Sequence, residues 1–228
     1  KMRVYVGYNE IFVTLQKIKI FIIACKSYFM YLPQSQILST TRLNRIFDYT
    51  SATYKFYWFL GILDLFVKQG KTRINEWEII VSMVTNAWYP INYFRLSFGK
   101  SDNLHEAILQ LQKKNNIPIN IGLNDLNMQL NQLIQHKEIK EKLSFLRNNV
   151  PFRFLSPWIH TSDNKEMVLR SQTFENGCLY RLVKDDREFW VELNPMWYTY
   201  LQENYEILTS FAYWGLTNFL QIRNPNVP

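Results

Sequence analysis

The stretch TSATYKFYWFLGILDLF, residues 50–66, decides the fold of this chain. Apolar side chains recur in it at intervals of four residues: Tyr54, Trp58, Ile62 and Phe66. This spacing places them on one face of a helix. The other positions are also strongly apolar, so we expect this helix to lie at the centre of the fold. We predict helical structure from Leu43 to Phe66, with Thr50 or Ser51 as an N-cap.

A second helix is predicted to begin at Asn75, whose side chain can cap it. Glu76 and Glu78 then fall in its first turn, where carboxylates interact favourably with the helix dipole. Its apolar face includes Trp77 and Trp88, and Pro90 is expected to end it.

Two more helices are predicted before residue 150. Ser101 or Asp102 can cap the first of them, and the sequence NNIP at 115–118 ends it. The second is expected to run from Asp125 to Leu146, with a strongly charged exposed face.

The sequence changes in character at Pro151. VPFRFLSPWI (150–159) is short, aromatic and interrupted by prolines, which favours a strand or an extended segment. The segments CLYRLV (178–183) and REFWVEL (187–193) flank a polar turn that contains Asp185 and Asp186, and this pattern predicts a β-hairpin. Asp is a common turn residue, so this acidic pair has a structural explanation.

Asn194 followed by Pro195 is a favourable start for a closing helix that reaches about Ile222. The predicted fold class is α+β and predominantly α-helical, with helices over 43–147, a small antiparallel β element at about 151–193 and a long closing helix at about 195–222. The predicted organisation is an atypical N-terminal extension (1–30), a helical part (31–150), and a hairpin with the C-terminal helix (151–228) packed on it as one domain.

Composition excludes several classes of protein. The chain is 47% hydrophobic and 16% aromatic, with few Gly and Pro residues, so it is not disordered, collagen-like or a disulfide scaffold. Its two cysteines, Cys25 and Cys178, are far apart in sequence and favour unpaired thiols in a reducing compartment. We therefore predict a cytoplasmic protein.

The net charge of +7 is unevenly distributed, because residues 1–30 contribute +4 and the rest only +3. The run from Ile20 to Cys25 is far shorter than the ~20 residues that span a bilayer. Its last four residues resemble a lipoprotein cleavage site at Cys25, but the apolar region before them is shorter than a signal peptide usually has. A packed strand pair, an amphipathic segment, or a true start at Met30 are the alternatives.

No catalytic site is visible from spacing alone. The chain has neither a glycine-rich phosphate loop nor a Gly-x-Ser-x-Gly motif. His105, His136 and His160 are isolated from each other and from cysteines, so they predict no sequence-local zinc site. An enzyme complete within this chain would need a pocket lined by perturbed carboxylates or histidines.

Aromatic and basic residues offer the remaining candidates. Trp58, Trp77 and Trp88 could stack on bases, but their helical spacing favours a place in the core. The candidate phosphate contacts are Lys55, Arg95, Lys100, Arg153 and Arg223. Each is otherwise an ordinary surface charge, and Arg153 could equally pack over neighbouring aromatic rings.

Several of these stretches resemble the N-terminal half of a bacterial HNH endonuclease family of Bacteroidetes type. They are ATYKFYWFLGIL (52–63), NAWYPINYFRLSFGKSDNL (86–104), VPFRFLSPWI (150–159), ELNPMWYTYLQENYEIL (192–208) and NFLQIRNPNVP (218–228). The resemblance covers about Leu43 to Pro228, and residues 1–30 fall outside it.

The resemblance implies a parent DNA endonuclease whose HNH module follows the RNPNVP segment and uses a histidine base and a divalent ion such as Mg²⁺. This chain contains no Asp-His pair and no His/Asn cluster for that chemistry, so it is expected to be truncated before the module and not catalytic by itself. Its expected role is DNA recognition or positioning, without a small-molecule cofactor or a membrane. The alternative is a protein-interaction or homodimerisation module, since aromatic residues dominate interface energetics.

Overall fold

The computed structural model describes residues 31–185 and 188–227. The α-helices are α2 (Thr40–Asn44), α3 (Tyr54–Ile62), α4 (Glu76–Asn92), α5 (Asn103–Lys114), α6 (Leu123–Leu133), α7 (Lys137–Phe154), α8 (Asn164–Ser171), α9 (Tyr198–Glu203) and α10 (Tyr205–Arg223). A π-helical turn (Leu63–Lys68) extends α3, and 3-10 turns lie at Glu175–Gly177 and Pro195–Trp197. The strands β1 (Arg73–Asn75), β2 (Tyr180–Asp185) and β3 (Glu188–Leu193) form one small antiparallel sheet. The predicted α+β, predominantly helical class is confirmed.

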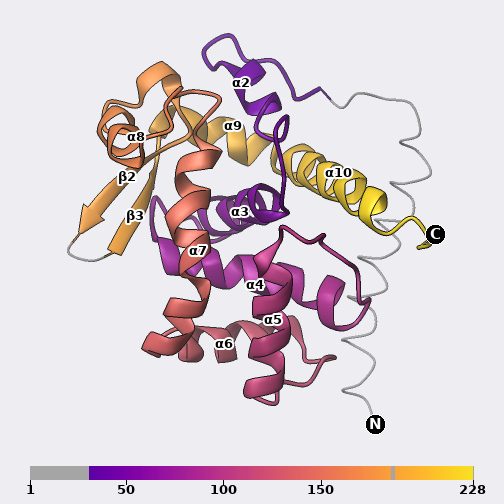
Figure 1. The fold of residues 1–228 in the computed structure, drawn as a ribbon. Coiled ribbons are helices and arrows are strands. Elements are labelled where there is room, and N and C mark those ends of the chain that lie inside the picture. Colours follow the sequence, from indigo (N-terminus) through magenta and orange to yellow (C-terminus); the bar gives the residue numbers. More distant parts are fainter. Residues whose placement is uncertain (1–30, 186–187, 228) are drawn as a thin grey trace.

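Helix α3 lies in the middle of the fold and packs against α4, α7 and α10 (Figure 1). Its residues from Phe56 to Ile62 are all buried, as the apolar character of this stretch predicts. Gly61 allows α4 to approach, because a Cβ there would lie 3.0 Å from Cγ2 of Ile79. The core of the protein is therefore built around the stretch that the sequence singles out.

The start of α3 differs from the prediction. Residues 45–53 form turns after the short α2, and Thr53 rather than Thr50 or Ser51 precedes the helix. The reason is a distant partner: the Asp102 carboxylate accepts hydrogen bonds from both the backbone N–H and the hydroxyl of Thr53, each at 2.7 Å.

Helix α4 begins as predicted, with a capping box. The Asn75 side chain accepts a hydrogen bond from Trp77 N–H at 2.9 Å, and Glu78 accepts one from Asn75 N–H. The predicted end at Pro90 is wrong, since α4 continues to Asn92. A proline removes only one backbone N–H from the helix, and its fixed φ is compatible with helical geometry. Because Pro90 lies near the end of α4, it does not prevent the last turn from forming.

Helix α5 confirms the predicted cap and end. Asp102 accepts a hydrogen bond from Leu104 N–H at 3.0 Å, and the helix ends at Lys114 before the NNIP segment. The single helix predicted from Asp125 to Leu146 is instead two helices, α6 and α7. Between them His136 takes an extended conformation (ψ 129°).

The break has a basis in the spacing of buried residues. In α6 and just after it they lie four apart, at Leu126, Leu130 and Ile134, whereas the next buried residue, Ile139, comes five later. The apolar stripes of α6 and α7 are thus out of phase. A single continuous helix could not turn both stripes towards the core, whereas two separate helices can.

The strand predicted within residues 150–159 is wrong. This segment forms the last turn of α7 and the turns that follow it. Its buried side chains have helical spacing: Val150, Pro151, Phe152, Phe154, Leu155, Trp158 and Ile159. The Tyr180 hydroxyl donates a hydrogen bond to the carbonyl of Pro151 at 2.6 Å, which fixes this turn against β2.

The predicted β-hairpin is confirmed as β2 and β3. Strand β1 was not predicted; it pairs antiparallel with β3 and gives the strand order β1-β3-β2. Three residues are too few for a recognisable alternation, and β1 is a strand only because β3 lies beside it. Asp185 is placed at the end of β2, where Arg73 lies 3.6 Å from it, whereas Asp186 lies outside the described residues.

The closing helix begins as predicted but is interrupted. The Asn194 side chain accepts a hydrogen bond from Met196 N–H at 3.1 Å, and Pro195 is the first residue of a 3-10 turn. The chain then forms α9, leaves helical geometry at Asn204 (φ −109°, ψ 16°), and resumes as α10. Helix α8 was not predicted.

Candidate nucleic-acid interface

The connection between α4 and α5, residues 93–102, carries two of the five predicted cations. Arg95 and Lys100 are both exposed there. Arg95 has φ 53° and Gly99 has φ 91°, so the backbone reverses twice through left-handed conformations that favour glycine. We call residues 93–102 the basic loop.

The basic loop has a buried aromatic anchor between its two cations. Phe98 is fully buried, and its ring stacks on Tyr57 of α3 with centroids 5.8 Å apart. The ring of His105 meets Phe98 edge-on from the first turn of α5. The loop is therefore fixed to the core between its two cations.

The end of α10 binds the same loop. The Asn224 side chain accepts a hydrogen bond from Ser97 N–H at 2.7 Å and donates one to the Ser97 carbonyl at 2.8 Å. It also donates to the Leu220 carbonyl at 2.8 Å. Figure 1 shows the end of α10 beside the connection between α4 and α5.

Arg223 joins the two loop cations at this place. Its guanidinium lies over the Phe219 ring at 3.4 Å and donates to the Phe219 carbonyl at 3.0 Å. The Arg223 side chain also lies against the basic loop, because a Cβ on Gly99 would be 2.8 Å from Nε and 3.0 Å from Cδ of Arg223. We call Arg95, Lys100 and Arg223 together the basic edge.

The cations of the basic edge differ from most others in the protein. In the described part of the chain none of them forms an ion pair with a carboxylate, whereas most basic residues of the helices and the sheet do. An uncompensated cluster of this kind is what attracts an anion such as a phosphate.

The other two predicted cations form a separate group. Lys55 is half-buried on α3 and donates a hydrogen bond to the Ile46 carbonyl at 3.1 Å. Burial lowers the pKa of its ammonium group, nearby Asp48 opposes this shift, and Arg153 adds to it. Arg153 is exposed at the end of α7. Because Lys55 is half-buried and bound to a backbone carbonyl, Arg153 is the more accessible cation of this pair.

The remaining candidates are accounted for by the fold. Trp58, Trp77 and Trp88 are all buried, which confirms their place in the core. His136 precedes α7, and the carbonyl of His160 accepts a hydrogen bond from Arg170. Cys178 is a free, buried thiol, and Cys25 lies outside the described residues.

One perturbed carboxyl group, that of Glu76, was expected from the sequence only to begin a helix. Its side chain is fully buried where α4, α7 and β3 meet. Oε1 lies 2.6 Å from Nε of Arg147 and accepts a hydrogen bond from Phe189 N–H at 3.1 Å. Burial raises the pKa of Glu76 to about 7, and the Phe189 N–H and Arg147 only partly offset this effect.

A half-exposed layer of charge surrounds this carboxyl group. Glu188 lies beside it and accepts hydrogen bonds from Lys140 and Asn75, each at 2.7 Å, and Lys140 lies over the Trp77 ring. These partners come from α4, α7 and β1, so the cluster joins elements that are distant in sequence. No sequence signal could have located it, because each contact depends on the tertiary fold.

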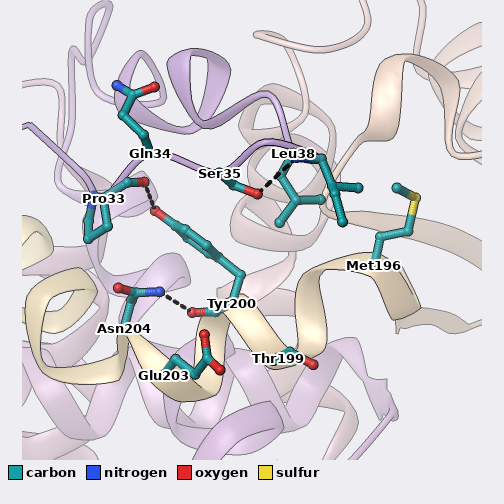
Figure 2. A pocket seen from close by; sticks show the side chains of 10 residues that line it. Pro33, Gln34, Ser35, Leu38, Met196, Thr199, Tyr200, Glu203 and Asn204 are labelled. Atoms are coloured by element: carbon teal, nitrogen blue, oxygen red, sulfur yellow. Dashed lines mark hydrogen bonds between the residues drawn. The ribbon is translucent and has the colours of Figure 1, made fainter.

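A pocket of about 540 Å³ lies between residues 33–38 and α9 (Figure 2). Tyr200 crosses it and donates a hydrogen bond to the Pro33 carbonyl at 2.8 Å. Its wall contains one carboxylate, Glu203, and apolar side chains that include Leu38 and Met196. Neither Glu76 nor a histidine lines it, and burial raises the pKa of the Tyr200 hydroxyl in its wall to about 12.

Comparison with known proteins gives no relative: no family model, no curated protein and no solved structure matches the chain. Within residues 31–185 and 188–227, no three or more His, Cys, Asp and Glu side chains come together as they would to hold a metal ion. No helix in this part is long and apolar enough to cross a membrane.

Proposed function

We propose that this chain is the DNA-positioning part of an HNH endonuclease and that the basic edge contacts backbone phosphates. One observation carries the proposal: Arg223 lies against the loop that carries Arg95 and Lys100, and none of the three has a carboxylate partner in the described part of the chain. Arginine and lysine on an ordered loop neutralise phosphates and set the register of a protein on a duplex. Such a role also favours the bacterial cytoplasm.

The nuclease chemistry belongs to the proposed parent protein and comes from the family resemblance alone. A divalent ion such as Mg²⁺ would stabilise the phosphate oxyanion in the HNH module. The described residues of this chain do not fit such an ion, since no cluster of suitable ligands lies among them. The proposal for this chain is therefore limited to binding, and no step through such an ion is derived from it.

Fluorescence anisotropy with a labelled duplex of about 20 base pairs tests the proposal, at salt concentrations from about 50 to about 200 mM. The double variant Arg95→Ala/Lys100→Ala removes two cations of the basic edge. We expect it to weaken binding at least about 10-fold and to reduce the slope of log K against log salt by about 2.

The matched control is Lys165→Ala/Lys184→Ala, which removes the same charge from exposed positions on α8 and β2. We expect it to change the affinity less than about 3-fold, because it lowers only the overall attraction. Equal losses in the two variants would contradict the assignment to the basic edge. If the wild-type protein binds neither duplex nor single strand at low salt, the DNA-binding role itself is wrong.

The alternative of a homodimer or protein-interaction module predicts a different result. Apolar side chains are exposed around the pocket of Figure 2, including Ile37 and Met196. Light scattering would then detect association that depends on protein concentration and hardly on salt, since apolar burial is insensitive to screening.

A further inference from the structure

The basic edge is assembled from two segments that one side chain connects. Asn224 and Ser97 are 127 residues apart, and the Asn224 amide binds both backbone groups of Ser97. A side-chain amide has an acceptor oxygen and two N–H donors, so the oxygen and one N–H can copy the pairing of a neighbouring β-strand while the second N–H binds elsewhere. Aspartate at this position could accept from Ser97 N–H but could not donate to the carbonyl.

The same amide also fixes the end of α10. Its Nδ2 donates to the Leu220 carbonyl, one of the last carbonyls of the helix, which have no helical partner. Leu220 is itself buried in the core. Asn224 therefore connects a rigid helix end to the backbone midway between Arg95 and Lys100.

On the Arg95 side, Leu96 N–H donates a hydrogen bond to the Pro90 carbonyl at 2.9 Å, so this part of the basic loop is already held at one end. Phe98 anchors it by its ring, and the Ser97 hydroxyl accepts a hydrogen bond from Gly99 N–H at 3.2 Å within the loop itself. Arg95 lies in a left-handed conformation that is unfavourable for arginine and needs support from its surroundings. Without Asn224 the backbone between Leu96 and Phe98 would have more freedom, because its hydrogen bonds to another segment run through Ser97.

We infer that Asn224 is a positioning residue, which holds Arg95 and Lys100 at a fixed spacing from Arg223 so that the three cations bind successive phosphates of one nucleic-acid backbone. This inference rests on the proposed function. Asn224 need not touch the nucleic acid. It acts by preorganisation, because a loop already in its binding conformation loses less entropy when it binds.

The test uses two pairs of variants that keep all three cations. Asn224→Ala is compared with Asn226→Ala, and Asn224→Asp with Asn226→Asp, since Asn226 is exposed and has no hydrogen bond from its side chain in the described structure. The second pair is matched for the added negative charge. Binding to the duplex of about 20 base pairs is measured over the same salt range, and thermal unfolding is followed in parallel.

We expect each Asn224 variant to bind about 3-fold to 10-fold more weakly than its Asn226 control, with a salt slope smaller by about 1. The melting temperature should stay within about 2 °C of the control, because the bonds lie at the surface. The slope identifies positioning, since a general loss of folded protein lowers the apparent affinity without changing the number of phosphates contacted.

The outcomes separate the two proposals. If the wild type binds DNA, Arg95→Ala/Lys100→Ala weakens it, and both Asn224 variants match their controls in affinity and slope, then Asn224 has no positioning role. In that case the basic edge still stands as the binding site. If the wild type does not bind, the proposed function fails and this inference fails with it.

Discussion

Asp102 contacts Thr53 across the fold, and its carboxylate fixes the starts of two helices. One oxygen accepts hydrogen bonds from the N–H and the hydroxyl of Thr53 before α3, and the other accepts from Leu104 N–H in α5. Asp102 is 5% exposed, so water cannot replace these bonds. The central helix and the end of the basic loop thus depend on the same buried side chain.

Asp102→Ala is therefore expected to destabilise the protein by about 3 kcal/mol or more, because it removes one helix cap and leaves the Thr53 N–H buried without a partner. Asp163→Ala is the control, since Asp163 caps α8 at the surface through Lys165 N–H. Asp163→Ala should lower the free energy of unfolding by only about 1 kcal/mol. Urea unfolding measures both, and similar losses would show that the Thr53 contact contributes nothing.

Glu76 is expected to make stability depend on pH. Its pKa is about 7 in the folded protein and close to the ordinary value of 4.5 when unfolded. Between these values the folded state holds a proton that the unfolded state has released. The free energy of unfolding should therefore fall as pH rises from about 5 to about 8, by up to roughly 3 kcal/mol.

Glu76→Gln removes this titration and should flatten the pH dependence of the free energy of unfolding. The lost contact with Arg147 changes the absolute stability but not this pH dependence. Glu78→Gln is the control, because this carboxylate lies in the same turn of α4 but is 34% exposed. Urea unfolding at several pH values measures the pH dependence of stability in the wild type and in both variants. An unchanged slope in Glu76→Gln would show that Glu76 is already ionised in the folded protein at low pH.

Much of the fold was predictable because its signals are local. The apolar stripe of α3, the caps at Asn75 and Asn194 and the β2–β3 turn each involve neighbouring residues. Pro151 misled the prediction, because a proline beside aromatic residues resembles an extended segment while its buried neighbours have helical spacing.

The candidate site was less predictable. Arg95, Lys100 and Arg223 were singled out as separate charges, and only the fold brings the end of α10 to the loop. The burial of Glu76 depends on Arg147 and on Phe189, which lies 113 residues away. Sequence spacing carries no information about contacts of this range.

Gly215 is expected to be required for packing between α10 and α3. A Cβ at this position would lie 2.7 Å from a ring carbon of Phe56 and 3.3 Å from one of Phe47, so both rings would have to move. Gly215→Ala should lower stability by about 1–3 kcal/mol, although alanine is the better helix former by about 1 kcal/mol.

Asn218→Ala provides the comparison, because Asn218 is exposed on the same helix. This change should be neutral or slightly stabilising, since only helix propensity is altered. Thermal unfolding of both variants measures the difference. A gain in stability for Gly215→Ala would mean that the Phe47 and Phe56 rings can move without loss of packing.

Cys178 is expected to be chemically inert in the folded protein. Its side chain is fully buried and donates a hydrogen bond to the Tyr180 carbonyl at 3.3 Å. Burial raises the pKa of the Cys178 thiol to about 12, so almost none of the reactive thiolate exists at neutral pH. In the variant Cys25→Ser, where Cys178 is the one remaining cysteine, a thiol-specific reagent should react only after urea unfolds the protein. Reaction of the native variant at the rate of a free cysteine would show that β2 opens readily around this thiol, and the rate in increasing urea would then give the free energy of that opening.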